Sequence, residues 1–156
     1  MKMEELKQKY VRLFPDDGEM NQQEIKEIEG HLNLEFPDDF RKIISFYLGG
    51  KLGNRFLLNF QTVGNYSIEE ETLALRESIN LPHDFLVLYC EYGMIYMDCN
   101  PNSAKYGHVM YVRTEDAQCL GDGIEPKYYW DYPTFSDFFE HLLDEEEKER
   151  AENVEQ

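Results

Sequence analysis

Residues 85–97 of the chain read Phe-Leu-Val-Leu-Tyr-Cys-Glu-Tyr-Gly-Met-Ile-Tyr-Met. Short apolar runs with aromatic and β-branched residues are typical of strands, and this stretch has two of them, at residues 85–89 and 94–97. Between the two runs lies Gly93, and glycine favours tight turns. The stretch therefore predicts a β-hairpin, with residues 85–89 as a central strand of the fold.

The region before this hairpin is predicted to be mainly helical. Apolar residues recur at helical spacing within residues 6–14, 25–32 and 40–47. Asn21 and Ser67 are each followed three residues later by a glutamate, a spacing that is typical of the first turn of a helix. We therefore expect three helices, followed by a fourth that starts after Ser67.

The clearest helical pattern comes after Thr134, where the last helix is expected.

Further strands are expected at residues 55–60 and 109–113. Helices at the start, strands in the middle and a helix at the end predict an α+β fold, a single domain over residues 1–143 with a mostly antiparallel or mixed sheet flanked by helices. The apolar pattern of the last helix stops after Leu143, so residues 144–156 are expected to be an acidic tail, either helical or frayed. The apolar positions of the last helix are Phe135, Phe138, Phe139, Leu142 and Leu143.

A strong negative charge dominates the composition. Of 156 residues, 32 are Asp or Glu and 15 are Lys or Arg, which gives a net charge of −17 at pH 7. Proteins that grip phosphate backbones use clustered Lys and Arg, so this charge disfavours binding to nucleic acid and to anionic membranes. The charge is spread along the whole predicted domain as well as the tail. Two interpretations of this charge stay open: it only confers solubility, or it forms a surface that attracts a basic partner.

The sequence indicates neither export nor a disulfide scaffold. No apolar run after Met1 has the form of a signal peptide, and no window is long and apolar enough for a membrane span. Cys90, Cys99 and Cys119 form no CxxC pair and no even set, so no disulfide framework or zinc site is predicted. We expect a cytoplasmic protein with reduced thiols and without a metal or cofactor.

No segment carries a recognisable catalytic motif. Residues 49–53, Gly-Gly-Lys-Leu-Gly, lack the GxxxxGK[ST] spacing of a phosphate loop, and Gly49 and Gly50 are instead expected to end the third helix. No serine lies in a GxSxG motif, and nothing places a cysteine beside a histidine. Glu115 and Asp116 are interpreted as part of a solvated acidic loop rather than as catalytic carboxylates. An enzyme is therefore the least favoured class.

The remaining signal is for recognition. Residues 121–132 combine acidic residues, turn residues and four aromatic residues without helical periodicity. Trp and Tyr are frequent in binding hot spots because they provide large contact areas at low entropic cost. Two interpretations stay open for Trp130: it belongs to a binding surface, or it covers the core where the chain enters the last helix. Residues 69–71, three glutamates, form a second acidic cluster, which also favours the start of a helix.

Several segments match a family pattern when they are taken together. They are Ile-Lys-Glu-Ile-Glu at residues 25–29, Phe-Pro-Asp-Asp-Phe at 36–40, Phe-Tyr-Leu-Gly-Gly at 46–50 and Thr-Phe-Ser-Asp-Phe-Phe at 134–139. This order resembles the SUKH superfamily, whose pattern runs Ile-x-x-x-Glu, Leu-Gly-x-x-Leu-Pro, Asp-[Tyr/Phe], Phe-Leu and Asn-Gly-Gly. The resemblance spans residues 21–143. Asn33, Phe36 and Leu48 stand where the family has Gly, Leu and Asn.

The resemblance implies a partner-binding role without catalytic residues. Bacterial members of this superfamily are mainly immunity proteins, each neutralising the toxin domain of a polymorphic or contact-dependent toxin, often a nuclease. A smaller set resembles fungal regulators of cell-wall glucan synthesis. We therefore expect an immunity protein that binds a basic toxin domain, with a regulatory adaptor of cell-wall or glucan synthesis as the alternative. The candidate contact residues are Glu69, Glu70, Glu71, Glu115, Asp116, Asp122, Glu125, Trp130 and Asp131.

Overall fold

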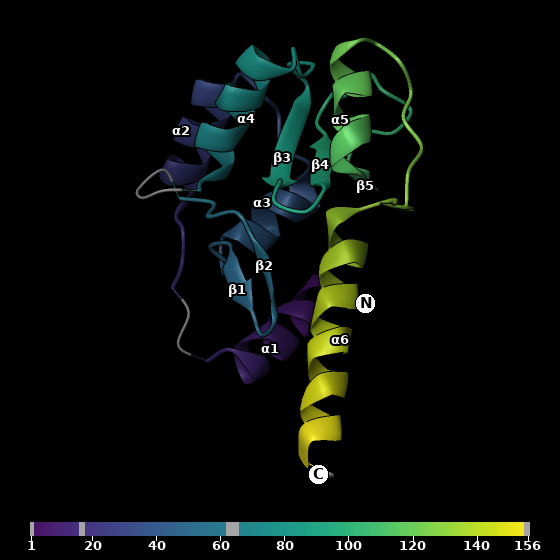
Figure 1. The fold of residues 1–156 in the computed structure, drawn as a ribbon. Helices are drawn as coiled ribbons and strands as arrows, with labels where there is room; N and C mark the ends of the chain where they lie inside the picture. Colours follow the sequence, from purple (N-terminus) through teal and green to yellow (C-terminus); the bar gives the residue numbers. More distant parts are fainter. Residues whose placement is uncertain (1, 16–17, 62–65, 155–156) are drawn as a thin grey trace.

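The structure is a computed structural model that describes residues 2–15, 18–61 and 66–154 (Figure 1). It confirms the α+β fold class. The helices within these ranges are α1 (Met3–Leu13), α2 (Gln22–Leu32), α3 (Asp38–Ile44), α4 (Ile68–Ser78), α5 (Thr114–Gly121) and α6 (Phe135–Val154). The strands are β1 (Gly50–Leu52), β2 (Arg55–Leu57), β3 (Phe85–Tyr89), β4 (Met94–Asp98), β5 (Val109–Val112) and β6 (Trp130–Tyr132).

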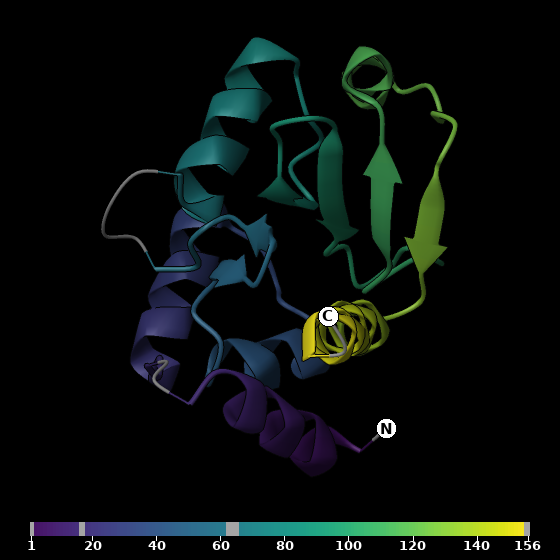
Figure 2. The same cartoon turned by 60° about the horizontal axis from the view of Figure 1, so that its bottom comes forward.

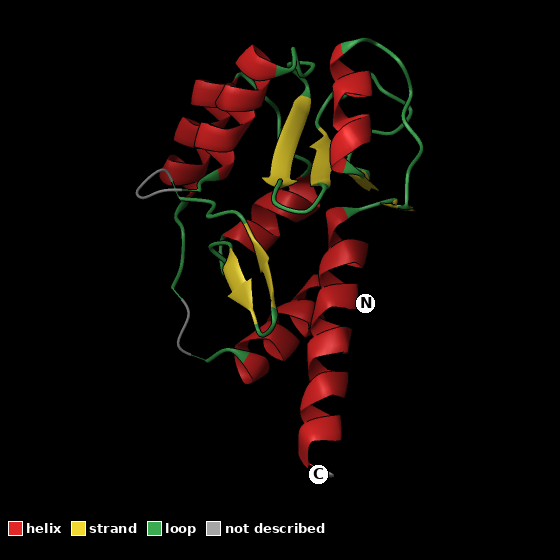
Figure 3. Ribbon diagram, in the orientation of Figure 1, coloured by secondary structure: helices red, strands yellow, loops and turns green. Residues whose placement is uncertain are grey.

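The strands form two antiparallel sheets within the described ranges: a hairpin of β1 with β2, and a larger sheet in the order β3-β4-β5-β6 (Figure 3). The predicted hairpin is present, with Val87 of β3 opposite Tyr96 of β4. The prediction that residues 85–89 form a central strand is wrong, because β3 comes first in the sheet order and β4 lies inside it. β3 is buried nonetheless, since α4 packs on it and the amide of Leu58 donates a hydrogen bond to its Leu88 carbonyl at 2.9 Å.

The helices connect the hairpin to the larger sheet. α4 packs against β3, and α2 lies beside α4. α6 contacts α1 and α3 as well as the strands β1 and β6, as the end-on view of α6 shows (Figure 2). α6 therefore links the helical layer, the hairpin and the edge of the larger sheet.

An aromatic cluster fills the space between α1, α3 and α6. Its centre is the buried side chain of Phe139, whose ring centroid lies 5.7 Å from that of Tyr10 and 5.1 Å from that of Tyr47. One turn earlier, the ring of Phe135 lies 4.7 Å from that of Phe40. The predicted apolar stripe of α6 is confirmed, because all its members are buried.

The predicted helix starts are confirmed by their hydrogen bonds. The side chain of Asn21 accepts a bond from the amide of Glu24 at 2.9 Å, and that of Ser67 accepts one from the amide of Glu70 at 3.0 Å. These bonds satisfy amide groups that have no partner inside the helix. α2 and α4 thus begin where the sequence places them.

Short elements account for the other errors of the sequence analysis. α3 ends at Ile44, five residues before Gly49, and Gly50 begins β1 instead of ending a helix. Glu115 and Asp116 lie in the first turn of α5 and not in an acidic loop. β6 was not predicted. Elements of this length owe their stability to packing rather than to local propensity, so the sequence pattern marks them weakly.

Helix α6 continues past residue 143 and contacts other elements. Residues 144–154 are helical, which is one of the two alternatives for the predicted tail, and Glu146 is only 7% exposed. Side chains of residues 144–154 form ion pairs with α1 and β2. This part of α6 therefore packs along the domain, although the domain was expected to end at residue 143. The ion pairs are Lys9–Asp144, Arg12–Glu147 (2.8 Å) and Arg55–Glu149 (2.5 Å).

These ion pairs predict that the end of α6 loosens in acid and in salt. Hydrogen bonds from Arg12 and Arg55 lower the pKa of Glu147 and Glu149, respectively, from 4.5. A carboxylate with a lowered folded-state pKa stabilises the fold above its unfolded pKa, and this contribution is lost as the pH falls below that value. We expect hydrogen-exchange protection of residues 145–154 to fall below pH 4.5 and in high salt, while α2 keeps its protection. The variant R12Q should lose part of this protection at neutral pH, and full protection in acid would contradict the prediction.

Candidate functional site

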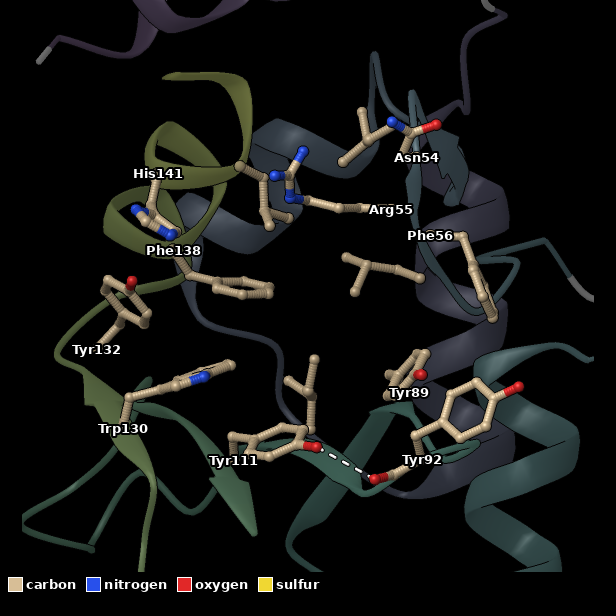
Figure 4. Close-up of a pocket in the computed structure, with 14 residues that line it drawn as sticks. Asn54, Arg55, Phe56, Tyr89, Tyr92, Tyr111, Trp130, Tyr132, Phe138 and His141 are labelled. Carbon is tan, nitrogen blue, oxygen red and sulfur yellow. Dashed lines mark hydrogen bonds between the residues drawn. The ribbon is translucent and has the colours of Figure 1, made fainter. Parts of the chain in front are cut away.

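A cleft lies where the β1–β2 hairpin, the larger sheet and α6 meet (Figure 4). Its volume is about 480 Å³, and binding pockets typically measure about 300–1,000 Å³. The side chains around it are mainly apolar. The aromatic ones are Phe56, Tyr89, Tyr92, Tyr111, Trp130, Tyr132 and Phe138.

One wall of the cleft is a stack of rings from β5, β6 and α6. Tyr111 and Trp130 are register partners on neighbouring antiparallel strands, so they point to the same face of the sheet. Their rings stack with centroids 5.5 Å apart. Phe138 of α6 stacks on Trp130 at 5.2 Å. Both the sheet and the helix therefore hold Trp130 in place.

The opposite wall comes from the hairpin and from the turn between β3 and β4. Phe56 of β2 lies edge-to-face with Tyr89 of β3 at 5.3 Å. Tyr92 lies in the turn, and its side chain is 82% exposed. Its carbonyl accepts a hydrogen bond from the Tyr111 hydroxyl at 3.2 Å, drawn as a dashed line in Figure 4. A side chain at Gly93 would overlap that hydroxyl, so glycine there lets Tyr111 fix the turn to the sheet.

Arg55, Asn54 and His141 are the polar side chains beside these rings (Figure 4). The Arg55 guanidinium pairs with Glu149 at 2.5 Å and with Glu145 at 3.8 Å. Both carboxylates come from the end of α6. The positive charge of Arg55 is therefore balanced within the chain.

Two tyrosine hydroxyls and one thiol near the cleft have pKa values above their ordinary values. Burial raises the pKa of Tyr89 and of Tyr132. Burial, together with the charge of Glu71, raises the pKa of the Cys90 thiol to about 12. Since the thiolate is the reactive form of cysteine, Cys90 is a poor nucleophile. In the described ranges, no three His, Cys, Asp or Glu side chains are grouped so as to hold a metal ion.

The sequence matches a known family model. The model of the SMI1 / KNR4 family (SUKH-1) matches residues 19–141. The chain belongs to this family. The resemblance to the SUKH superfamily is thus confirmed, and the matched part holds both sheets but not the end of α6. No curated protein matches the chain. None of the helices in the described ranges has the length and apolar character needed to span a membrane.

Two predicted contact residues of this SUKH-1 protein lie together at the cleft. Trp130 forms part of its wall, and Glu115 borders an adjoining hollow with Tyr92, Tyr129 and Trp130. The two interpretations of Trp130 are compatible, because its ring packs on buried Phe138 and also lines the cleft. Tyr129 is 60% exposed. The surface around Trp130 therefore combines exposed rings with a carboxylate.

A third predicted residue, Glu71, lies on the other side of Phe56. It borders a hollow together with Phe56, Tyr66 and Glu91. Glu91 precedes Tyr92 in the turn and is exposed. We call Glu71, Glu91 and Glu115 the acidic rim. Glu71 and Glu91 border a hollow that shares Phe56 with the cleft, and Glu115 borders a hollow that shares Tyr92 and Trp130 with it.

The other predicted contact residues lie away from the cleft, and most contact other side chains of the chain. Asp131 follows Trp130 in β6 and points to the opposite face, because neighbouring residues of a strand alternate. Glu70 is exposed in the first turn of α4. The contacts are Asp131 with His108 (2.8 Å) and Lys105 (3.4 Å), Glu125 with Lys105 (3.9 Å), Asp116 with Arg113 (3.0 Å), Asp122 with Gln118 (3.3 Å) and Glu69 with His31 (2.5 Å).

The sequence analysis missed the aromatic residues Phe56, Tyr92 and Tyr111. Phe56 and Tyr111 lie in segments that were predicted as strands, but the prediction gave no face to either strand. The alternation of Trp130 and Tyr132 could have indicated β6 and its aromatic face. Tyr92 lies in a predicted turn and has no periodic neighbours, so no local pattern marks it.

Proposed function

We propose that this SUKH-1 protein is an immunity protein of the cytoplasm that binds a basic toxin domain and blocks it without catalysing a reaction. The cleft and the acidic rim form the proposed contact surface. The observation that carries the proposal is the exposed aromatic surface around Trp130, bordered by carboxylates. The family match supports a binding role of this kind.

The aromatic side chains supply the contact area. Tyr92 is 82% exposed, Tyr129 60% and Phe56 39%. Large rings that stand exposed together and are braced from below are what binding hot spots use, because they lose little side-chain entropy on binding. Tyr111, which stacks on Trp130, contacts the ring of Tyr129 at 5.5 Å and holds the backbone of Tyr92 through its hydroxyl.

The carboxylates supply attraction to a basic partner. The two arginines at this surface, Arg55 and Arg113, are each paired with two carboxylates. Glu115 of the acidic rim is one of the two partners of Arg113, and Glu71 and Glu91 add further negative charge on a chain of net charge −17. Such a surface accelerates encounter with a cationic protein and weakens with salt.

We propose further that the toxin is a nuclease. A nuclease binds its substrate in a cationic cleft, and an acidic protein competes with nucleic acid for that cleft. The first partner to test would be a toxin domain encoded directly beside the gene of this protein. Its nuclease activity should fall as the protein is added in stoichiometric amounts. Activity that stays unchanged, together with recovery of a cell-wall synthesis protein from native cells, would favour the regulatory adaptor.

The contact surface is tested by reversing the charge of the acidic rim. The triple variant E71K, E91K and E115K should lower the association rate with the toxin domain at least about tenfold at low salt and abolish most of its salt dependence. The matched control reverses three glutamates of α1 and α2, which line no part of the cleft: E4K, E5K and E27K. Both variants change the net charge equally, and thermal melts check that both fold. An equal loss of rate in the two variants would place the contact surface elsewhere.

A further inference from the structure

We propose that the hollow beside Glu71 is a receptor for one lysine side chain of the partner, with the ammonium bound by Glu71 and Glu91. The inference rests on the proposed function, since it names the chemistry that the toxin presents to this part of the acidic rim. We call this site the Glu71 hollow. The residues that line it are Phe56, Leu58, Tyr66, Glu71, Cys90 and Glu91.

The apolar part of the Glu71 hollow suits an aliphatic stem. Its volume is about 340 Å³. Leu58 is buried, whereas the side chains of Phe56 and Tyr66 are 39% and 67% exposed. The hollow thus has apolar groups both in its interior and at its opening. Lysine lays its four-carbon stem along apolar surface of this kind and keeps its charged head among polar atoms.

The charged part of the Glu71 hollow is made of two carboxylates without a cation. Glu71 is half-buried in the first turn of α4, and Glu91 is exposed in the turn between β3 and β4. Every Lys and Arg of the chain lies in the described ranges. None of these cations lines the hollow, and none forms an ion pair with Glu71 or Glu91. A cation of the partner therefore meets negative charge that the chain itself does not pair.

Both carboxylates act on the same group, the thiol of Cys90. Burial, then the charge and hydrogen bond of Glu71, and then the charge of Glu91 raise the pKa of this thiol to about 12. The neutral thiol donates a hydrogen bond to Glu71 at 3.6 Å. A thiol is a weak donor, and a carboxylate has about four lone-pair sites. Most of the acceptor capacity of Glu71 is therefore left for a donor from outside.

The arrangement of the carboxylates favours an ammonium over other cations. An ammonium carries three N–H donors on a compact head, so it can bond to carboxylates that come from different elements. A guanidinium instead pairs best with one carboxylate in a shared plane. Within the described ranges, Glu71, Cys90 and Glu91 do not form a group that could hold a metal ion. Lysine is therefore the occupant that matches both the stem and the head of the site.

The test uses Cys90 to carry an ammonium into the hollow. The full chain is equilibrated with equal amounts of cystamine and hydroxyethyl disulfide and of their thiols, which gives aminoethyl and hydroxyethyl adducts of nearly equal size. Mass spectrometry measures the ratio of the two adducts at Cys90. We expect this ratio to be about three- to tenfold higher in the folded chain than in urea, between the effect of an exposed ion pair and that of a buried charged hydrogen bond.

Equal ratios at Cys90 in the folded and unfolded chain would overturn the inference. The guanidino derivative of cystamine is the third probe, because it places the head group of arginine in the same position. Its adduct should form less readily than the aminoethyl adduct in the folded chain, relative to the unfolded one. A guanidino adduct that is favoured as strongly as the aminoethyl adduct would overturn the choice of lysine.

Variants of α4 locate the ammonium. E71Q should remove most of the preference at Cys90, because it removes the half-buried carboxylate beside the thiol. E70Q is the matched control: Glu70 is the neighbouring residue, is exposed and does not line the hollow, so the preference should stay. Each change removes one charge and keeps the size of the side chain, and thermal melts check the fold. Equal losses in E71Q and E70Q would contradict the assignment.

The outcomes separate this inference from the proposed function. No preference for the ammonium at Cys90, with toxin binding that still depends on the acidic rim, refutes the lysine receptor and leaves the toxin surface standing. An ammonium preference that depends on Glu71, with toxin binding that ignores the acidic rim, supports the receptor and refutes the proposed toxin surface.

Discussion

Replacing Phe139 by alanine is expected to lower the free energy of unfolding by about 3–5 kcal/mol, the usual cost of removing a fully buried phenylalanine. The ring is completely buried and contacts the rings of Tyr10, Tyr47 and Phe46. These rings come from α1 and from the segment after α3, so they cannot collapse together into the space without moving two helices. Because domains of this size are stable by about 5–15 kcal/mol, the loss is a large part of the total.

Urea denaturation of F139A, followed by circular dichroism, measures this loss. The matched control is F56A, which removes the same side chain at a site that is 39% exposed. F56A should lower the free energy of unfolding much less, since most of the space left by the removed ring opens to solvent. A similar loss in both variants would mean that the cluster of Phe139 is not the centre of the core.

The same cluster shows which parts of the fold can be predicted from the sequence. α6 was predicted correctly in its apolar half because Phe135, Phe139 and Leu142 repeat at helical spacing. Its continuation to Val154 was left open, since it is held by ion pairs to Lys9, Arg12 and Arg55 and has no apolar stripe. Contacts between residues far apart in the chain leave no periodic signal.

The site was predictable only in part for a related reason. Trp130 was singled out because aromatic residues cluster in its segment. The sequence cannot show that its strand lies beside β5 or that Tyr92 stands across the cleft from it, since both facts follow from the register of the sheet. It also cannot separate Glu115, at the rim, from Asp131, which faces His108 and Lys105 on the other side.

Replacing Gly49 by alanine is expected to destabilise the protein by about 2–5 kcal/mol, combining backbone strain with overpacking. Gly49 has φ of +82°, a conformation that costs a residue with a Cβ atom. A Cβ atom here would also overlap the carbonyl oxygen of Leu58 and lie 2.8 Å from the amide nitrogen of Phe60. That amide donates a hydrogen bond to Leu48 at 2.9 Å, so the two segments cannot separate without losing the bond.

Gly50 offers a matched control for the backbone term alone. Its φ is +84°, nearly the same as at Gly49, but a Cβ atom there would meet no atom within 4 Å. G50A should therefore cost only about 1–2 kcal/mol, which is the strain of the left-handed conformation. The difference between the two variants in urea denaturation measures the close approach of residues 49 and 58. Glycine is then required at residue 49 because of this close approach and not because a helix ends there. Equal losses of unfolding free energy in G49A and G50A would refute this explanation.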